Sequence, residues 1–279
     1  MRRLRNPTQK PSLSSGALFC LTLGYILHAI VTAPAIFPRI SNPATAPVIA
    51  FISSSDPVKT TLCEETWLKR LHSYVLFSSR KSVKTNQVRV PHRAGSLWSS
   101  FSTKALFADR YIPHYFSWYI ITTDDTYILV DDLMQDLAAF DSDEPYIAVI
   151  GPRSRQQPTT TDLHSVIVAS RGAMSSIWDK IRDGREGCSV TSAPERCLSD
   201  VVHINLRQDA HERYRFHVMR RHFSKHEMRD YAHQHKGYTD DAQTLSMLSD
   251  SLISVHNLTA EDFRIFDLLF NRVKVLPKH

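Results

Sequence analysis

The chain has 279 residues, 42% of them apolar, and a formal net charge of +6 at pH 7. This composition excludes a mainly disordered chain and allows one large core or two modest ones. The first 55 residues contain five basic residues and no acid, which leaves about +1 for the remainder. A nucleic-acid-binding surface needs basic residues gathered on the folded face, so no nucleic-acid partner is expected. The five basic residues are Arg2, Arg3, Arg5, Lys10 and Arg39.

An uncharged run near the N-terminus predicts a membrane anchor. No charged residue occurs from Pro11 to Pro38, and Leu18 to Phe37 is almost entirely apolar. About twenty apolar residues can span a bilayer as a helix. The basic residues before the run are expected to stay in the cytoplasm, which sends the rest of the chain into the lumen.

The predicted organisation is therefore a single-pass type II protein. Its parts are a cytoplasmic tail over 1–15, a signal-anchor helix over 16–37, a short stem over 38–47 and a luminal domain over 48–279. A signal peptide cleaved after Ala33-Pro34-Ala35 is one alternative, and a buried helix of a soluble protein is another. The first two interpretations both place the folded part in the secretory pathway.

Apolar runs of strand length and helix length alternate after the stem. Val58, Leu62, Trp67 and Leu71 recur at helical spacing between two short apolar runs, which predicts a parallel β-α-β unit. The expected strands are 48–52, 74–77, 119–121, 146–150 and 165–169, and the expected helices are 58–71, 98–111, 127–140 and 171–181. The fold class is therefore α/β. Neither a GxGxxG nor a Walker sequence is present, which disfavours Rossmann dehydrogenases and P-loop enzymes.

Cysteine usage fits an oxidising lumen. Cys20 lies in the predicted span, and the short interval between Cys188 and Cys197 predicts a disulfide that leaves Cys63 free. No pair of metal-ligand motifs occurs at zinc-finger spacing. Asn257-Leu258-Thr259 is a glycosylation sequon, which is a weak pattern.

Two adjacent carboxylates, Asp124 and Asp125, follow the apolar run that ends at Thr123. Ligands of open α/β sheets bind at the carboxyl ends of strands, and carboxylates there can hold a divalent cation that neutralises a diphosphate. The alternative is that the two aspartates only cap the helix that follows. A second polar stretch, His203 to His235, contains seven of the fourteen histidines and is interpreted as a solvated surface that could contact a diphosphate.

The sequence around these carboxylates resembles the core 1 synthase family, the inverting β1,3-galactosyltransferases that act on O-linked N-acetylgalactosamine. The resemblance covers residues 48–272 as many weak matches in a fixed order. The matching segments are Glu65-Thr66-Trp67, Val75 to Ser79, Trp118 to Leu133, Val168 to Arg171, Arg196-Cys197, Phe216-His217, Ser249-Asp250 and Ser254-Val255-His256.

The resemblance implies a GT-A glycosyltransferase fold, UDP-galactose as donor, Mn²⁺ as cofactor and residence in the Golgi membrane. It also implies a glycoprotein acceptor, with a homodimer or a chaperone complex as the assembly. By position, Asp125 is the main metal carboxylate, Asp124 its donor-side neighbour, His256 the distal metal ligand and His217 a donor-binding residue.

Three departures from the family pattern concern its catalytic side. Thr123 replaces the first of three aspartates, and Leu163-His164-Ser165-Val166 replaces a glycine-rich turn. The family's Glu-Asp-Leu is missing between the cysteines, where Glu195 is the only acid and hence the candidate base for an inverting transfer.

These departures keep two other functions open. One is a catalytically inactive relative that acts as a chaperone or binding partner of core 1 synthase. That chaperone has a Leu-Thr like Leu258-Thr259, but it lacks the aspartate cluster and the distal histidine. The other is a fringe-like β1,3-glycosyltransferase that uses the same fold on another sugar.

Overall fold

The computed structural model describes residues 47–79, 86–89, 97–112, 116–151, 165–184, 188–189, 197–219 and 248–272. All of them belong to one unit that spans 39–279. The predicted tail, the signal-anchor helix and the stem up to residue 46 lie outside the described residues, as does Glu195. Within the described part, no helix has both the length and the apolarity to cross a membrane.

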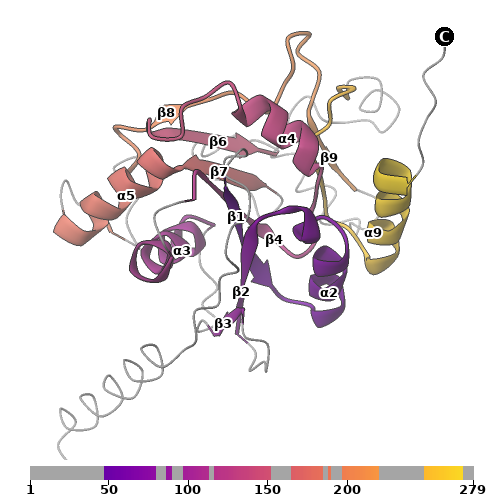
Figure 1. The fold of residues 1–279 in the computed structure, drawn as a ribbon, viewed down its shortest axis with the longest axis horizontal. Coiled ribbons are helices and arrows are strands. Elements are labelled where there is room, and N and C mark those ends of the chain that lie inside the picture. The colour runs from indigo at the N-terminus through magenta and orange to yellow at the C-terminus, as the bar shows by residue number, and fades with distance from the viewer. Residues whose placement is uncertain are drawn as a thin grey trace, which may run out of the picture. The chain divides into compact units, whose positions relative to one another are not determined.

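A seven-stranded mixed sheet with the order β3-β2-β1-β4-β7-β6-β8 lies at the centre of the fold (Figure 1). β1 is parallel to both β2 and β4, while β7 is antiparallel to β4 and β6. The chain adds β2 on one side of β1 and β4 on the other, so the boundary between β1 and β4 is a topological switch point. The strands are β1 (Val48–Ser54), β2 (Ser73–Ser78), β3 (Gln87–Arg89), β4 (Trp118–Thr123), β6 (Tyr146–Ile150), β7 (Val166–Ser170) and β8 (Val202–His203).

A second sheet has three short strands in the order β5-β10-β9. The central strand, β10 (Ser254–His256), is antiparallel to β5 (Tyr127–Ile128) and parallel to β9 (Phe216–Val218). Because β5 follows β4 after only three residues, this small sheet begins at the carboxyl end of β4. It therefore brings the C-terminal part of the chain to the switch point.

Helices cover both faces of the large sheet. Phe107 of α3 packs edge-on against Phe51 of β1, with ring centres 6.4 Å apart, while Leu62 of α2 belongs to the core on the other face. Figure 1 shows α3 and α5 on one side of the sheet and α2 and α9 on the other. The helices are α2 (Pro57–Glu65), α3 (Leu97–Tyr111), α4 (Val130–Leu137), α5 (Arg171–Asp183) and α9 (Ala260–Asp267), with the 3₁₀ turn η1 (Leu68–Arg70) and the π-helical turn η4 (Leu268–Arg272).

The α/β class is confirmed, and each predicted strand is present within two residues of its expected bounds. The predicted helix over 127–140 is wrong at its start, because Tyr127 and Ile128 pair with β10 and the helix begins only at Val130. The predicted helix over 58–71 ends at Glu65 and is followed by a 3₁₀ turn. Val58, expected on its buried face, is 56% exposed.

A tight corner joins β7 to α5. Ser170 caps the helix by accepting a hydrogen bond from the Ala173 amide, 3.0 Å away, and Gly172 follows in the first turn. The Gly172 amide donates to the carbonyl oxygen of Ser142 at 3.0 Å. A Cβ at Gly172 would lie only 2.1 Å from the carbonyl oxygen of Asp143, so this close approach requires glycine.

Candidate active site

The candidate site lies where β1 and β4 end. Ser53 and Thr123 are register partners on these parallel strands, so their side chains point to the same face of the sheet. The main chain continues directly into the two aspartates, and the Asp124 amide donates to the Ser53 carbonyl oxygen at 3.1 Å. The predicted carboxylates therefore stand at the switch point, where α/β sheets bind ligands.

Asp124 is a structural carboxylate. It is 2% exposed, and its Oδ2 accepts hydrogen bonds from the main-chain amides of Ser55 and Asp56, each at 2.7 Å. The hydroxyls of Ser55 and Thr60 also donate to it, at 2.9 and 3.2 Å. Burial raises the pKa of Asp124, and the bonds from Asp56 and Ser55 partly offset that rise. The carboxylate thus binds the N-terminus of α2, and these four donors engage both of its oxygens.

The structure also tests the alternative that the two aspartates cap the helix after them. The helix that follows the aspartates, α4, has Leu129 at its N-cap and no side-chain cap. Capping of that helix by Asp124 or Asp125 is therefore wrong, because β5 lies between them. Asp124 instead serves α2, a helix more than sixty residues earlier in the chain, which local sequence could not indicate.

Asp125 has a different environment. Its carboxylate is half-buried, and its Oδ1 accepts a short hydrogen bond from the Thr123 hydroxyl. The Thr126 hydroxyl lies 3.4 Å from the same oxygen. The Asp125 carbonyl oxygen accepts from the Leu258 amide at 2.9 Å, which ties this residue to the end of β10. Thr123, which replaces the first of the family's three aspartates, thus orients the Asp125 carboxylate.

His256 reaches the same place from β10. It is fully buried, with Nδ1 3.3 Å from the Thr126 hydroxyl and Nε2 2.9 Å from the Ser254 hydroxyl. The Thr126 hydroxyl therefore lies between the Asp125 carboxylate and the imidazole. The structure brings Asp125 and His256 together, as the sequence prediction requires.

His217 does not join this pair. It is the register partner of Val255, the residue before His256, and neighbouring residues of a strand point to opposite faces. His217 thus lies on the face of the small sheet opposite His256. In the histidine-rich stretch, His203 and His211 are exposed, which agrees with a solvated surface, and residues 220–235 lie outside the described part.

The segment that replaces the family's glycine-rich turn is partly described. Val166 pairs with Ile150 inside β7, and Ser165 before it is fully buried. Val166 is therefore the first residue of β7 and Ser165 directly precedes the strand, while Leu163 and His164 lie outside the described residues.

The Cys188–Cys197 bridge is present, with the two Cα atoms 5.0 Å apart. Cys63 is a free, buried thiol whose Sγ lies 3.6 Å from the carbonyl oxygen of Asp124, and burial raises its pKa. In the sequon, Asn257 has a left-handed backbone (φ 59°), and its side-chain amide donates to the Met219 carbonyl oxygen at 3.0 Å.

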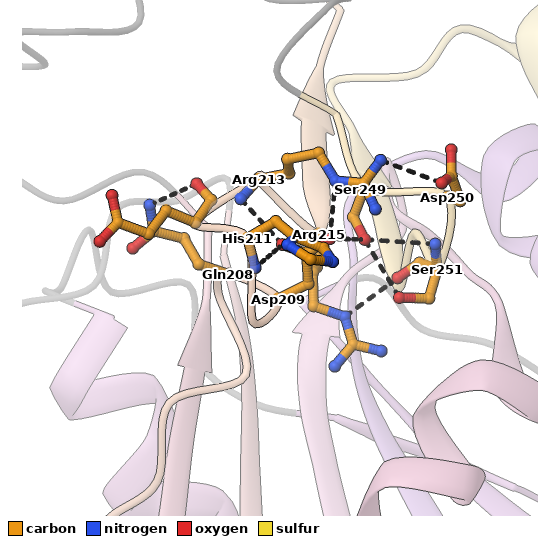
Figure 2. Close-up of polar contacts among 9 residues, drawn as sticks. Gln208, Asp209, His211, Arg213, Arg215, Ser249, Asp250 and Ser251 are labelled. Carbon is orange, nitrogen blue, oxygen red and sulfur yellow. Dashed lines mark hydrogen bonds and ion pairs between the residues drawn. The ribbon is translucent and has the colours of Figure 1, made fainter.

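The Ser-Asp pair of the family resemblance lies in a separate polar cluster (Figure 2). Ser249 donates to Asp209 at 2.7 Å, and Arg213 joins Asp209 and Asp250 with contacts of 2.9 Å each. The hydrogen bond from Ser249 is the main cause that holds the pKa of Asp209 below its usual range.

Next to this cluster is a pocket of about 340 Å³ lined by Asp132, Asp136, Gln208, Asp209, Arg215 and Ser251. Arg215 forms an ion pair with Asp136 at 2.5 Å inside it.

Sequence reasoning missed Lys104. This lysine of α3 is 2% exposed, and its Nζ lies 2.6 Å from the Ser53 hydroxyl at the end of β1. Its burial lowers the pKa to about 7. The available signal was its position three residues after Phe101 and four before Ala108, on the buried stripe of the helix.

Metal ligation would rest on few protein groups. Among the described residues, no cluster of three or more histidine, cysteine, aspartate or glutamate side chains could hold a metal ion. Asp125 and His256 provide a carboxylate and an imidazole, both of which Mn²⁺ accepts. Asp124 does not fit as a ligand, because its oxygens are bound to α2.

No protein-family profile matches the chain. The chain is 25% identical over 231 residues to the uncharacterized protein F37A4.3 of Caenorhabditis elegans, and the match covers 80% of this chain and 78% of that protein. Similar solved structures include the galactosyltransferase LgtC (TM-score 0.43, 10% identity, 82% of this chain and 98% of that one). Others are the bifunctional glycosyltransferase WbbM (0.46, 9%, 86% and 52%) and GlyE of Streptococcus pneumoniae (0.43, 11%, 80% and 60%). At TM-scores below 0.5, this likeness carries no argument about the activity of the chain.

Proposed function

We propose that the chain is a glycosyltransferase that uses a nucleotide-sugar donor at the Asp125–His256 site. The observation that supports it is that the Thr126 hydroxyl contacts both the Asp125 carboxylate and the His256 imidazole. His256 lies 130 residues after Thr126 in the chain, so the fold brings the two candidate ligands close together. These contacts lie at the switch point of the sheet, where nucleotides bind in α/β folds. The family resemblance in the sequence also identified Asp125 and His256 as candidate metal ligands.

In this proposal, Asp125 and His256 hold a divalent ion, for which Mn²⁺ suits their mixed oxygen and nitrogen ligands. The ion, when bound, neutralises the charge of a diphosphate leaving group. Thr123 orients the Asp125 carboxylate through its hydrogen bond. One nitrogen of the His256 imidazole would bind the ion in place of its hydroxyl partner, and the hydrogen bond at the other nitrogen, to Thr126 or Ser254, would orient the ring. Ligands held by such outer bonds keep a fixed geometry.

The finer assignment follows the resemblance. We propose UDP-galactose as donor and O-linked N-acetylgalactosamine on glycoproteins as acceptor, joined in β1,3 linkage by an inverting transfer. Glu195 is the proposed base for the acceptor hydroxyl. We also propose a GT-A-like domain on a type II anchor in the Golgi membrane.

Turnover tests the proposal directly. The purified full chain is incubated with UDP-galactose, Mn²⁺ and an N-acetylgalactosamine glycoside, and the disaccharide is measured. Product should form, and Asp125→Asn should abolish it, because a neutral amide is a poor metal ligand. Asp131→Asn is the matched control, since Asp131 is an exposed aspartate of α4 that forms an ion pair with Arg70 at 3.1 Å. Equal loss in both variants would contradict a role for Asp125.

A second function, a non-catalytic relative that acts as a chaperone or binding partner, is favoured by one observation. Asp124 is bound to α2, so only Asp125 remains of the two carboxylates. Manganese-dependent UDP binding with no transfer from any UDP-sugar would favour this reading. Transfer from a UDP-sugar other than UDP-galactose would instead support the fringe-like enzyme.

The proposed location has its own test. In intact microsomes, protease should spare the domain over 48–279, because it lies in the lumen. Digestion of that domain without detergent would contradict the type II topology.

A further inference from the structure

Lys104 is a buried lysine that lacks an ionic partner among the described residues. Its Nζ donates to the Ser53 hydroxyl at 2.6 Å and lies 5.6 Å from the centre of the Phe77 ring. An ammonium group has three N–H donors, and a buried one is unfavourable unless charges or hydrogen bonds compensate it. The described part of the chain therefore compensates the Lys104 charge poorly.

Lys180, the other described buried lysine, shows the ordinary solution. Its side chain is held by Asp200 and by the Ser199 hydroxyl, each at 2.8 Å. Lys180 thus has a carboxylate where Lys104 has only a hydroxyl and a ring. The ion pair with Asp200 accounts for the burial of Lys180, whereas the described contacts of Lys104 do not account for its burial.

The position of Lys104 supplies the missing explanation. Its partner Ser53 is the next-to-last residue of β1 and the register partner of Thr123 on β4. Thr123 in turn donates to Asp125. The Lys104 ammonium therefore lies under the strand ends that carry the candidate site, on the face to which Ser53 and Thr123 point.

We propose that Lys104 is the countercharge for a phosphate of the bound donor, reached at the carboxyl ends of β1 and β4. This inference rests on the proposed function and adds a residue to it. Phosphate oxygens accept hydrogen bonds from an ammonium group, and such charge-assisted bonds are about twice as strong as neutral ones. The depressed pKa of Lys104 fits a group whose charged form a bound anion would stabilise, and perturbed pKa values are common at functional sites.

Calorimetric titration of the full chain with UDP, inorganic pyrophosphate and uridine, at constant Mn²⁺, tests the inference. Lys104→Met removes the charge and keeps an apolar chain of similar length. It should weaken UDP and pyrophosphate binding about 10- to 100-fold, since both contact the ammonium, and leave uridine binding unchanged. Lys104→Gln, which keeps a polar side chain without the charge, is the second variant and should show the same selective loss.

Lys180→Met is the matched control. It should lower the melting temperature slightly, because it breaks the ion pair of a buried lysine with an exposed aspartate and its hydrogen bond to Ser199, and leave all three affinities unchanged. Lys104→Met should instead raise the melting temperature, because it removes a poorly compensated charge. A raised melting temperature together with weaker phosphate binding is the combination that a purely structural lysine would not give.

The outcomes separate this inference from the proposed function. Equal UDP affinity in wild type and Lys104→Met would overturn the role of Lys104 and leave the transferase proposal standing. Lys104-dependent pyrophosphate binding without UDP binding would support the role of Lys104 and overturn the proposed donor. A wild-type chain that binds neither would overturn both.

Discussion

Asp124→Ala should lower the free energy of unfolding far more than Asp125→Ala does. The Asp124 carboxylate accepts hydrogen bonds from the amides of Ser55 and Asp56, at 2.7 Å each. It also accepts hydrogen bonds from the hydroxyls of Ser55 and Thr60. A hydrogen bond to a charged group is worth about 1.5–3 kcal/mol, so loss of the two amide bonds to this carboxylate should cost about 3–6 kcal/mol. Asp125→Ala removes a half-buried carboxylate that accepts hydrogen bonds from the Thr123 and Thr126 hydroxyls, and it should cost about 1 kcal/mol.

Urea unfolding followed by tryptophan fluorescence measures both changes. With a denaturant slope of about 2 kcal/mol/M, Asp124→Ala should lower the midpoint by about 2 M and Asp125→Ala by about 0.5 M. Manganese-dependent UDP binding should show the opposite order, with loss in Asp125→Ala and in His256→Ala. If Asp124→Ala unfolds at the wild-type midpoint and loses UDP binding, the capping role of Asp124 is refuted and the residue is a ligand.

Three further predictions concern stability. Burial holds the pKa of Lys104 at about 7, so the unfolded chain, whose lysine titrates near 10.4, binds more protons above that pH. Unfolding free energy should therefore rise by about 2 kcal/mol from pH 7 to 9, and urea titrations of Lys104→Met should lack this rise. Gly172→Ala should lower stability by about 1–3 kcal/mol, because the new Cβ would meet the carbonyl oxygen of Asp143; an unchanged melting temperature in calorimetry would contradict this. Reduction of the Cys188–Cys197 bridge should cost roughly 2–3 kcal/mol, measured as the urea midpoint with and without reductant, and a Cys188→Ser, Cys197→Ser double variant should be insensitive to the reductant.

The sequence by itself determined the strands and most of the helices of the large sheet. β1 is buried on both faces, so it appears in the sequence as a continuous apolar run that needs no knowledge of its neighbours. The disulfide was equally local, because closing the short loop between two nearby cysteines costs little conformational entropy. The placement of Asp124 and Asp125 at a strand end followed from the apolar run before them.

Only the tertiary structure decided how those residues are used. Tyr127 and Ile128 are a strand because β10, far along the chain, offers them backbone partners, and this pairing outweighs a local helical pattern. Asp124 turns to α2, while Asp125 remains beside Thr126 and His256, although the two aspartates are neighbours of the same type. The reason is physical: spacing along the chain fixes the period of burial, but the partner of a buried charge is set by which distant donors the packing brings within hydrogen-bond distance.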